Sequence, residues 1–282
     1  MKPFLIVAGV TALAVLAGAG VLHLIPRLGR VGKRAAAALC EAPGLDLVVT
    51  YFTVAPLFVG PAVAGWRGFA GAVVGQVCGM LAWQVCHEWY HREHVKGPRI
   101  VKVLNRIFGP WRNYTAVWIT AIVTPLFWFI RVAEVALYPF LVRLVNFPPY
   151  RGGEWVNVSR QKFCGLVGHD LVWCLYCDWM TGVWSLGTEM LRNVESFWCP
   201  IRFNSEKKCA NCAIDFPDVN GGWLPFGATM ADVAATVERM QGGGANGWFG
   251  HPNRVPLTVR GEVPRTATEL KREPEREPSL SS

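Results

Sequence analysis

Residues 68–90 read GFAGAVVGQVCGMLAWQVCHEWY, and this stretch decides the fold class. It carries no charged side chain until its last turn, so as a helix it can lie in hydrocarbon over most of its length. Gly68, Gly71, Gly75 and Gly79 recur at helical spacing and form a stripe of small residues. Such a stripe lets a second helix approach closely inside a membrane. The stretch therefore predicts a membrane-spanning helix with a tightly packed neighbour.

Two further apolar stretches precede it. The chain is 52% hydrophobic and 17% charged, against about 25% charged in a typical soluble domain. Pro3 to Leu24 is a run of about 22 mostly apolar residues, long enough to cross the hydrocarbon core as a helix. A cleaved signal peptide is the alternative for this run, although Lys2 is its only early charge. Leu45 to Trp66 is the second stretch, and its prolines are tolerated where neighbouring helices satisfy the freed backbone groups.

The basic residues predict the orientation. The formal net charge is +8, and the Lys and Arg side chains gather beside apolar stretches, which is typical of cytoplasmic loops rather than of nucleic-acid binding. The N-terminus then faces outward. The clusters are Arg27, Arg30, Lys33 and Arg34, followed by Arg92, Lys96, Arg99, Lys102, Arg106 and Arg112. We expect a multi-pass protein of the cell inner membrane that contacts membrane lipid and no nucleic acid.

Residues 115–147 form a fourth apolar segment with two possible courses. Its charge-free part is about 16 residues long, which is short for a span. Arg131 and Glu134 interrupt it, and Pro125 and Pro139 favour kinks. It either crosses the membrane, which leaves the following domain outside, or forms a re-entrant or interfacial hairpin. Because both flanks are basic, we favour an even number of passes or none, with a cytoplasmic C-terminal domain.

The expected organisation is a membrane domain over 1–150, a small cysteine-rich helical domain over 151–240 and a disordered tail over 241–282. Within the second region, Thr229 and Asp232 resemble a helix start, because a side chain at each position can bond the other's backbone. The tail combines glycine, proline and mixed charge. The predicted fold class is mainly α, with a polytopic helical membrane domain followed by a small helical cysteine-rich domain.

The segment HEWYHREH at the end of the third apolar stretch carries the clearest chemical signal. His87, His91 and His94 are spaced i, i+4 and i+7, so on a helix they share one face at the cytoplasmic end of a span. Neutral imidazoles suit iron, zinc and copper, and Glu88 or Glu93 can add a carboxylate or orient a ring. The alternative is an interfacial helix end whose histidines meet lipid headgroups.

This spacing is similar to the histidine boxes of membrane-bound di-iron hydroxylases and desaturases. The resemblance covers about eight residues, and that family needs several such boxes to bind its irons. The whole chain holds only six histidines, which are too few for the full family site. The resemblance therefore implies a metal-binding segment and not membership of that family.

Cysteines supply the second signal. The chain has nine, and Cys209-x2-Cys212 lies in a polar, loop-like stretch, as a metal knuckle should. Cys174-x2-Cys177 lies in an apolar helical run, where the two thiols share a face. Four thiolates, with Cys199 able to replace one, can hold a structural zinc ion or an iron–sulfur cluster. The alternative is that Cys174 and Cys177 are buried hydrophobic residues and that Cys209 and Cys212 form a disulfide in an external domain.

His169 and Asp170 form the third feature. In their apolar setting a histidine beside an aspartate can act as a base, as a ligand or as support for a metal site, and it can equally belong to a structural hydrogen-bond network. The leading hypothesis is a membrane-embedded metalloprotein with iron or zinc, acting as an oxidoreductase on a lipid-soluble substrate. The alternative is a non-enzymatic assembly or interaction factor that has a structural zinc domain and a protein partner in the membrane.

Overall fold

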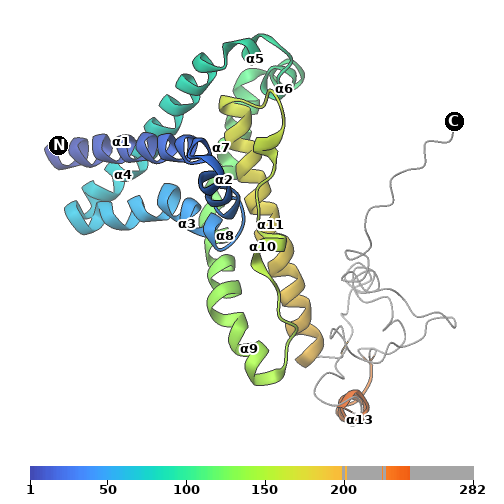
Figure 1. The fold of residues 1–282 in the computed structure, drawn as a ribbon. Helices are drawn as coiled ribbons and strands as arrows, with labels where there is room; N and C mark the ends of the chain where they lie inside the picture. The colour runs from blue at the N-terminus through green and yellow to red at the C-terminus, as the bar shows by residue number, and fades with distance from the viewer. Residues whose placement is uncertain (199–200, 202–223, 225–226, 242–282) are drawn as a thin grey trace, which may run out of the picture. The chain divides into compact units, whose positions relative to one another are not determined.

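The computed structural model describes residues 1–198, 201, 224 and 227–241. Over these residues the chain is mainly helical, as expected, and the only β-type pairings are two isolated bridges. Figure 1 shows the helices, which are α1 (Lys2–Leu24), α2 (Gly29–Ala38), α3 (Gly44–Val49), α4 (Ala55–Tyr90), α5 (Arg92–Lys96), α6 (Ile100–Phe108), α7 (Pro110–Ile122), α8 (Thr124–Val132), α9 (Tyr138–Val145), α10 (Gly152–Trp155), α11 (Gly168–Trp198) and α13 (Met230–Gln241). The expected tail beyond residue 241 lies outside the described residues.

Contacts divide the chain into two compact units. The first holds residues 1–131 and 151–186, and the second holds 132–150 together with the residues from 187 onward. This division does not follow the expected domain boundary at residue 150, because 151–186 clusters with the apolar N-terminal half. Backbone bonds show why: the Val158 N–H donates to the Cys40 carbonyl at 2.8 Å, and the Ala42 N–H donates to the Val156 carbonyl at 2.9 Å.

In the first unit, α1 packs along the second half of α4. A Cβ atom on Gly71 would lie 2.7 Å from the Phe4 carbonyl oxygen, and one on Gly79 would lie 2.9 Å from the Val15 Cβ. These positions admit only glycine without a shift, so the predicted small-residue stripe is confirmed as the surface of closest helix approach. The contacts advance together along both helices, so α1 and this half of α4 run parallel.

The apolar run Gly44–Tyr90 folds back on itself within α4. Its helical geometry breaks at Ala64 and at Gly65, whose φ of +57° suits glycine. Figure 1 shows the two arms of α4 diverging from this break. Lys2–Arg27, Gly44–Tyr90 and Pro110–Val145 are the helical stretches among the described residues that are long and apolar enough to cross a membrane. The predicted second span, Leu45–Trp66, comprises α3, a π-helical turn over Thr50–Val54 and the first arm of α4, and the predicted third span is its second arm.

The predicted fourth apolar segment begins with α7 and α8, which lie against α11. Trp118 meets Trp173 edge to face with ring centroids 5.6 Å apart, and Tyr176 donates its hydroxyl hydrogen to the Thr120 carbonyl at 2.9 Å. The opposite face stays apolar and open, as the 75% exposure of Phe129 shows. The segment is therefore covered on one side by a helix from its own unit.

A buried ion pair anchors the end of α8 in the first unit. Arg131 donates from Nε and Nη2 to the two carboxylate oxygens of Asp46, at 2.9 and 2.7 Å. Both side chains are largely buried, with exposures of 6% and 19%. A two-pronged pair of this kind fixes direction as well as distance. It ties the start of the α3–α4 run to the end of α8.

The second unit has its own aromatic core. Asn193 of α11 donates to the hydroxyl oxygens of Tyr138 and Tyr150, at 3.0 and 2.7 Å, and Phe147 is only 1% exposed. In the same unit, the Thr229 N–H donates to the Asp232 carboxylate at 2.8 Å at the start of α13. The predicted helix start at Thr229 is thus confirmed.

Candidate functional site

Four of the six histidines place their rings in one row, the histidine column, formed by His23, His87, His91 and His94. Ring centroids are 5.4 Å apart between His23 and His87, 4.5 Å between His87 and His91, and 6.2 Å between His91 and His94. Trp83 stacks on both His23 and His87. The three predicted histidines share a face as expected, while His23 joins them because α1 packs on α4.

The backbone at Gly168 holds the ring of His87. The Gly168 N–H donates to His87 Nδ1 at 3.1 Å, so the proton of the neutral ring sits on Nε2. Gly168 has a φ of +53°, and a Cβ atom there would collide with the Glu88 side chain. A metal-binding nitrogen must be unprotonated and free of other bonds. In His87, Nδ1 accepts the Gly168 hydrogen bond and Nε2 carries the proton, so this ring is not free to bind a metal in this arrangement.

Beside the column, Arg99 bridges two carboxylates. Its Nη2 donates to Glu88 at 2.7 Å and its Nε donates to Asp170 at 3.2 Å, with the Arg99 side chain only 6% exposed. Glu88 also accepts the His169 N–H at 3.0 Å, and Asp170 accepts the Val101 N–H at 3.1 Å. Glu88, His169 and Asp170, three of the predicted support residues, therefore lie together in one network that joins α4, the start of α6 and α11.

The network keeps Asp170 ionised. Burial by itself raises the pKa of Asp170, but the His169 side chain, the Arg99 charge and the Val101 N–H outweigh burial, so the pKa lies below its ordinary value. The His169 Nδ1 lies 3.6 Å from Asp170 and has no hydrogen-bond partner among the residues that the structure describes. Asp170 is thus a charged structural anchor, and His169 keeps hydrogen-bonding capacity.

Among the described residues, no three His, Cys, Asp or Glu side chains converge closely enough to hold a metal ion. The predicted ligands His87, His91 and His94 are brought together as a row of neighbouring, mutually tilted rings instead. Glu93, the other predicted carboxylate, is exposed and pairs with Lys96 at 3.2 Å. In this arrangement, a metal site in the column requires its rings to rotate.

The predicted cysteine site is only partly within the described residues. Cys174 and Cys177 lie on α11, and both interact with Arg160, whose Nε lies 2.6 Å from Asp178. Burial, the largest influence, raises the pKa of the Cys174 thiol. This setting favours a neutral thiol at Cys174 and places a cation, not a metal ligand, beside both sulfur atoms. The other predicted ligands, Cys199, Cys209 and Cys212, lie outside the described residues.

Three further residues matter here. In the sequence Arg99 is one member of a basic loop, yet it is the centre of the buried network, and Arg160 is likewise an ordinary basic residue by its sequence context. His23 does carry a signal in the sequence. The predicted orientation already places His23 and His87 at the same end of parallel spans, so the two histidines lie at one membrane depth.

Comparison with protein-family models, with curated proteins and with solved structures finds no match.

Proposed function

We propose that this chain is a multi-pass inner-membrane protein whose basic end faces the cytoplasm. The support is geometric. The first arm of α4 runs back past the second, and Gly60 lies against Gly68, while α1 runs parallel to the second arm. This places Lys2 and Arg67 at one end of the bundle. The opposite end collects the two basic clusters that begin at Arg27 and Arg92.

We further propose that residues 110–145 do not cross the bilayer. Within the first unit, residues 151–167 are mostly non-helical and carry Arg160 and Lys162, and they bond back to the chain near Cys40. Non-helical backbone is not viable in contact with lipid tails, so α7, α8 and this segment fit better outside the hydrocarbon. A reporter fused to the C-terminus should then report the cytoplasmic side, and an external signal would contradict this topology.

For chemistry, we propose that the histidine column binds one transition-metal ion through His91 and His94, with His23 completing the ligand set. The observation that carries this is the arrival of His23 from α1 beside the predicted cluster. Two imidazoles that bind one ion at about 2.1 Å each bring their ring centroids roughly 5 Å apart. The His91 and His94 rings lie 6.2 Å apart, about 1 Å beyond this spacing, and rotation about their soft terminal torsions can bring them to it. His23 stacks on His87, the neighbour of His91 in the column, so its ring must swing past His87 to reach the same ion.

Three neutral imidazoles suit iron, zinc or copper and leave a coordination position open. An open position at a membrane boundary supports redox chemistry on a lipid-soluble substrate. The proposal that Cys174, Cys177, Cys199, Cys209 and Cys212 also hold zinc or an iron–sulfur cluster is supported by their sequence spacing alone.

The test is metal analysis of the purified full chain with matched variants. His91→Ala and His94→Ala should each lose bound metal. His87→Asn is the control, because its side-chain oxygen can accept the Gly168 N–H in place of Nδ1, and this variant should keep the metal. Absence of stoichiometric iron, zinc or copper from the unmodified protein would sink the proposal, and equal loss in all three variants would refute the ligand assignment.

A non-enzymatic assembly or interaction factor is the second candidate. This candidate is favoured by the Arg99 network. Glu88 and Asp170 both bond Arg99 and so hold α11 against α4 and α6, which is a structural role. In that case His91→Ala leaves the protein's cellular role intact, while substitution of Cys209 or Cys212 abolishes it. The metalloprotein proposal predicts that His91→Ala alone removes the role while the protein stays folded.

A further inference from the structure

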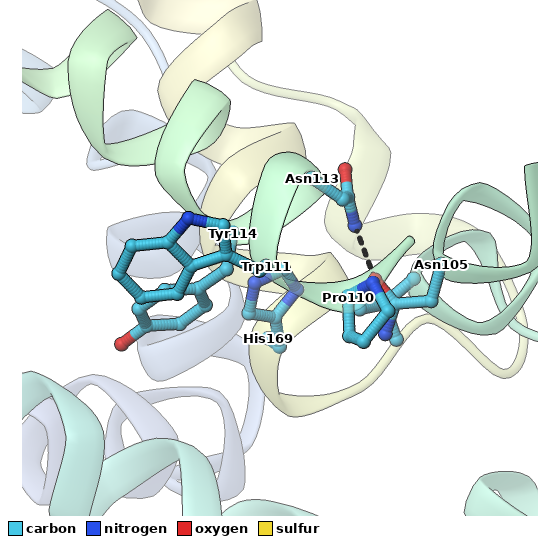
Figure 2. Close-up of a pocket in the computed structure, with 7 residues that line it drawn as sticks. Asn105, Pro110, Trp111, Asn113, Tyr114 and His169 are labelled. Atoms are coloured by element: carbon cyan, nitrogen blue, oxygen red, sulfur yellow. Dashed lines mark hydrogen bonds between the residues drawn. The ribbon is translucent and has the colours of Figure 1, made fainter. Parts of the chain in front are cut away.

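A pocket of about 450 Å³ opens beside the Arg99 network, between α6, α7 and the start of α11. Figure 2 shows the rings of Trp111, Tyr114 and His169 gathered at this pocket, with the amides of Asn105 and Asn113 next to them. All of these residues belong to the first unit. The lining is largely apolar and includes no charged side chain. This lining suits a neutral molecule with a ring that the aromatic side chains can contact.

The polar groups of the pocket have capacity left for a ligand. Asn113 donates to Asn105 Oδ1 at 2.8 Å, which leaves the Asn105 amide hydrogens and the Asn113 oxygen for other partners. His169 Nδ1 lies 3.6 Å from the Asp170 carboxylate without a hydrogen bond to it, so this ring of the pocket lining keeps hydrogen-bonding capacity for a ligand. The pocket therefore offers both donors and acceptors to ring oxygens.

The pocket also lies where a membrane-dissolved molecule can reach it. Helix α6 exposes Ile100, Val103 and Ile107 along one face, and Lys102 lies on another. Trp111 follows directly and is 78% exposed. A short basic amphipathic helix followed by an exposed indole is typical of the membrane–water interface. An amphiphile can thus place its ring in the pocket and leave its tail in the bilayer.

We infer that this pocket binds the neutral, oxygen-bearing ring of a membrane amphiphile of the quinone type. Trp111 and Tyr114 stack on the ring, while His169 and the asparagine pair bond its oxygens. The site lies next to the histidine column, since His87 accepts from Gly168 and His169 is the next residue. None of the side chains that line the pocket is a ligand in the proposed metal site, so binding of the amphiphile does not depend on the metal.

The experiment measures binding of decylubiquinone to the full chain in lipid nanodiscs, with decylbenzene as a probe that lacks ring oxygens. We expect saturable binding of the quinone and none of decylbenzene. Trp111→Ala and His169→Leu should each weaken binding by about tenfold. Trp66→Ala is the matched control, because Trp66 is 77% exposed and lies at the fold-back of α4, and it should bind like the unmodified protein.

Thermal unfolding in the same nanodiscs establishes that each variant is folded, and Trp111→Ala serves as the decisive variant if His169→Leu is unstable. Non-saturable uptake, equal uptake of decylbenzene, or equal weakening by Trp66→Ala overturns the inference. Competition by dodecylphosphocholine as strong as that by the quinone also overturns it, because the site would then be one for lipid headgroups. The His91→Ala variant should bind the quinone normally, which separates this inference from the metal proposal.

Discussion

Replacing Gly75 with alanine places a methyl group directly in the α1–α4 interface. The new Cβ would lie 2.7 Å from the Thr11 Cβ and would collide with the Ala8 carbonyl oxygen. Carbon atoms rest at about 3.5–4.0 Å, so the two helices must separate by roughly 1 Å to admit the methyl group. The Ala8 oxygen and the Thr11 Cβ both belong to α1, and neither atom is the flexible end of a long side chain that could move aside.

The expected cost follows from two opposing effects. Overpacking of this kind costs about 1–3 kcal/mol, and the change from glycine to alanine within a helix returns about 0.5–1 kcal/mol. The two ranges combine to a net loss of up to about 2.5 kcal/mol, with a central expectation of about 1 kcal/mol, which changes the ratio of folded to unfolded protein about fivefold.

Reversible unfolding in mixed detergent micelles, followed by tryptophan fluorescence, measures this change. Gly9→Ala is the matched control, because Gly9 lies within α1 and a Cβ there meets no atom within 4 Å. This control should be as stable as the unmodified protein or slightly more stable. If Gly75→Ala unfolds at the same denaturant concentration as Gly9→Ala, the parallel packing of α1 on α4 is refuted.

Three further predictions concern other contacts. The pKa of Asp170 is lowered in the fold, so its stabilising effect is complete above the ordinary carboxyl value of 3.8 and is lost as the pH falls through its folded pKa. Unfolding measured from pH 6 down to pH 3 should show this loss, and Asp170→Asn should show a shallower one. Arg131→Met leaves Asp46 buried without its partner and should cost about 3–5 kcal/mol, more than the double replacement with Asp46→Asn; equal costs in chemical unfolding would contradict the ion pair. Thr229→Ala removes a helix cap and should lower the stability of α13 by about 1 kcal/mol, seen as faster amide hydrogen exchange in its first turn, whereas unchanged exchange would argue against the cap.

The histidine column and the Arg99 network could be predicted only in part from the sequence. Some of their residues are neighbours on one helix, and others come from distant segments of the chain. His87, His91 and His94 are linked by local helical spacing, which can be read directly from the chain. His23 and Arg99 join the site through contacts between distant segments, and no spacing rule relates His23 to His87. The hydrogen bond from Gly168 to His87 removes one predicted ligand, and it depends on a left-handed backbone at Gly168 that has no local pattern.

The sequence by itself determined the apolar helices, the division between Leu45–Trp66 and residues 68–90, and the glycine stripe, because hydrophobic length and helical periodicity are properties of neighbouring residues. It left open the course of residues 115–147. Only the tertiary structure placed residues 151–186 with the N-terminal half, through backbone bonds such as that from Val158 to Cys40. Only the tertiary structure identified Asp170 as an anchor for Arg99 rather than as a catalytic group. The partner of a buried charge is set by packing and not by proximity along the chain.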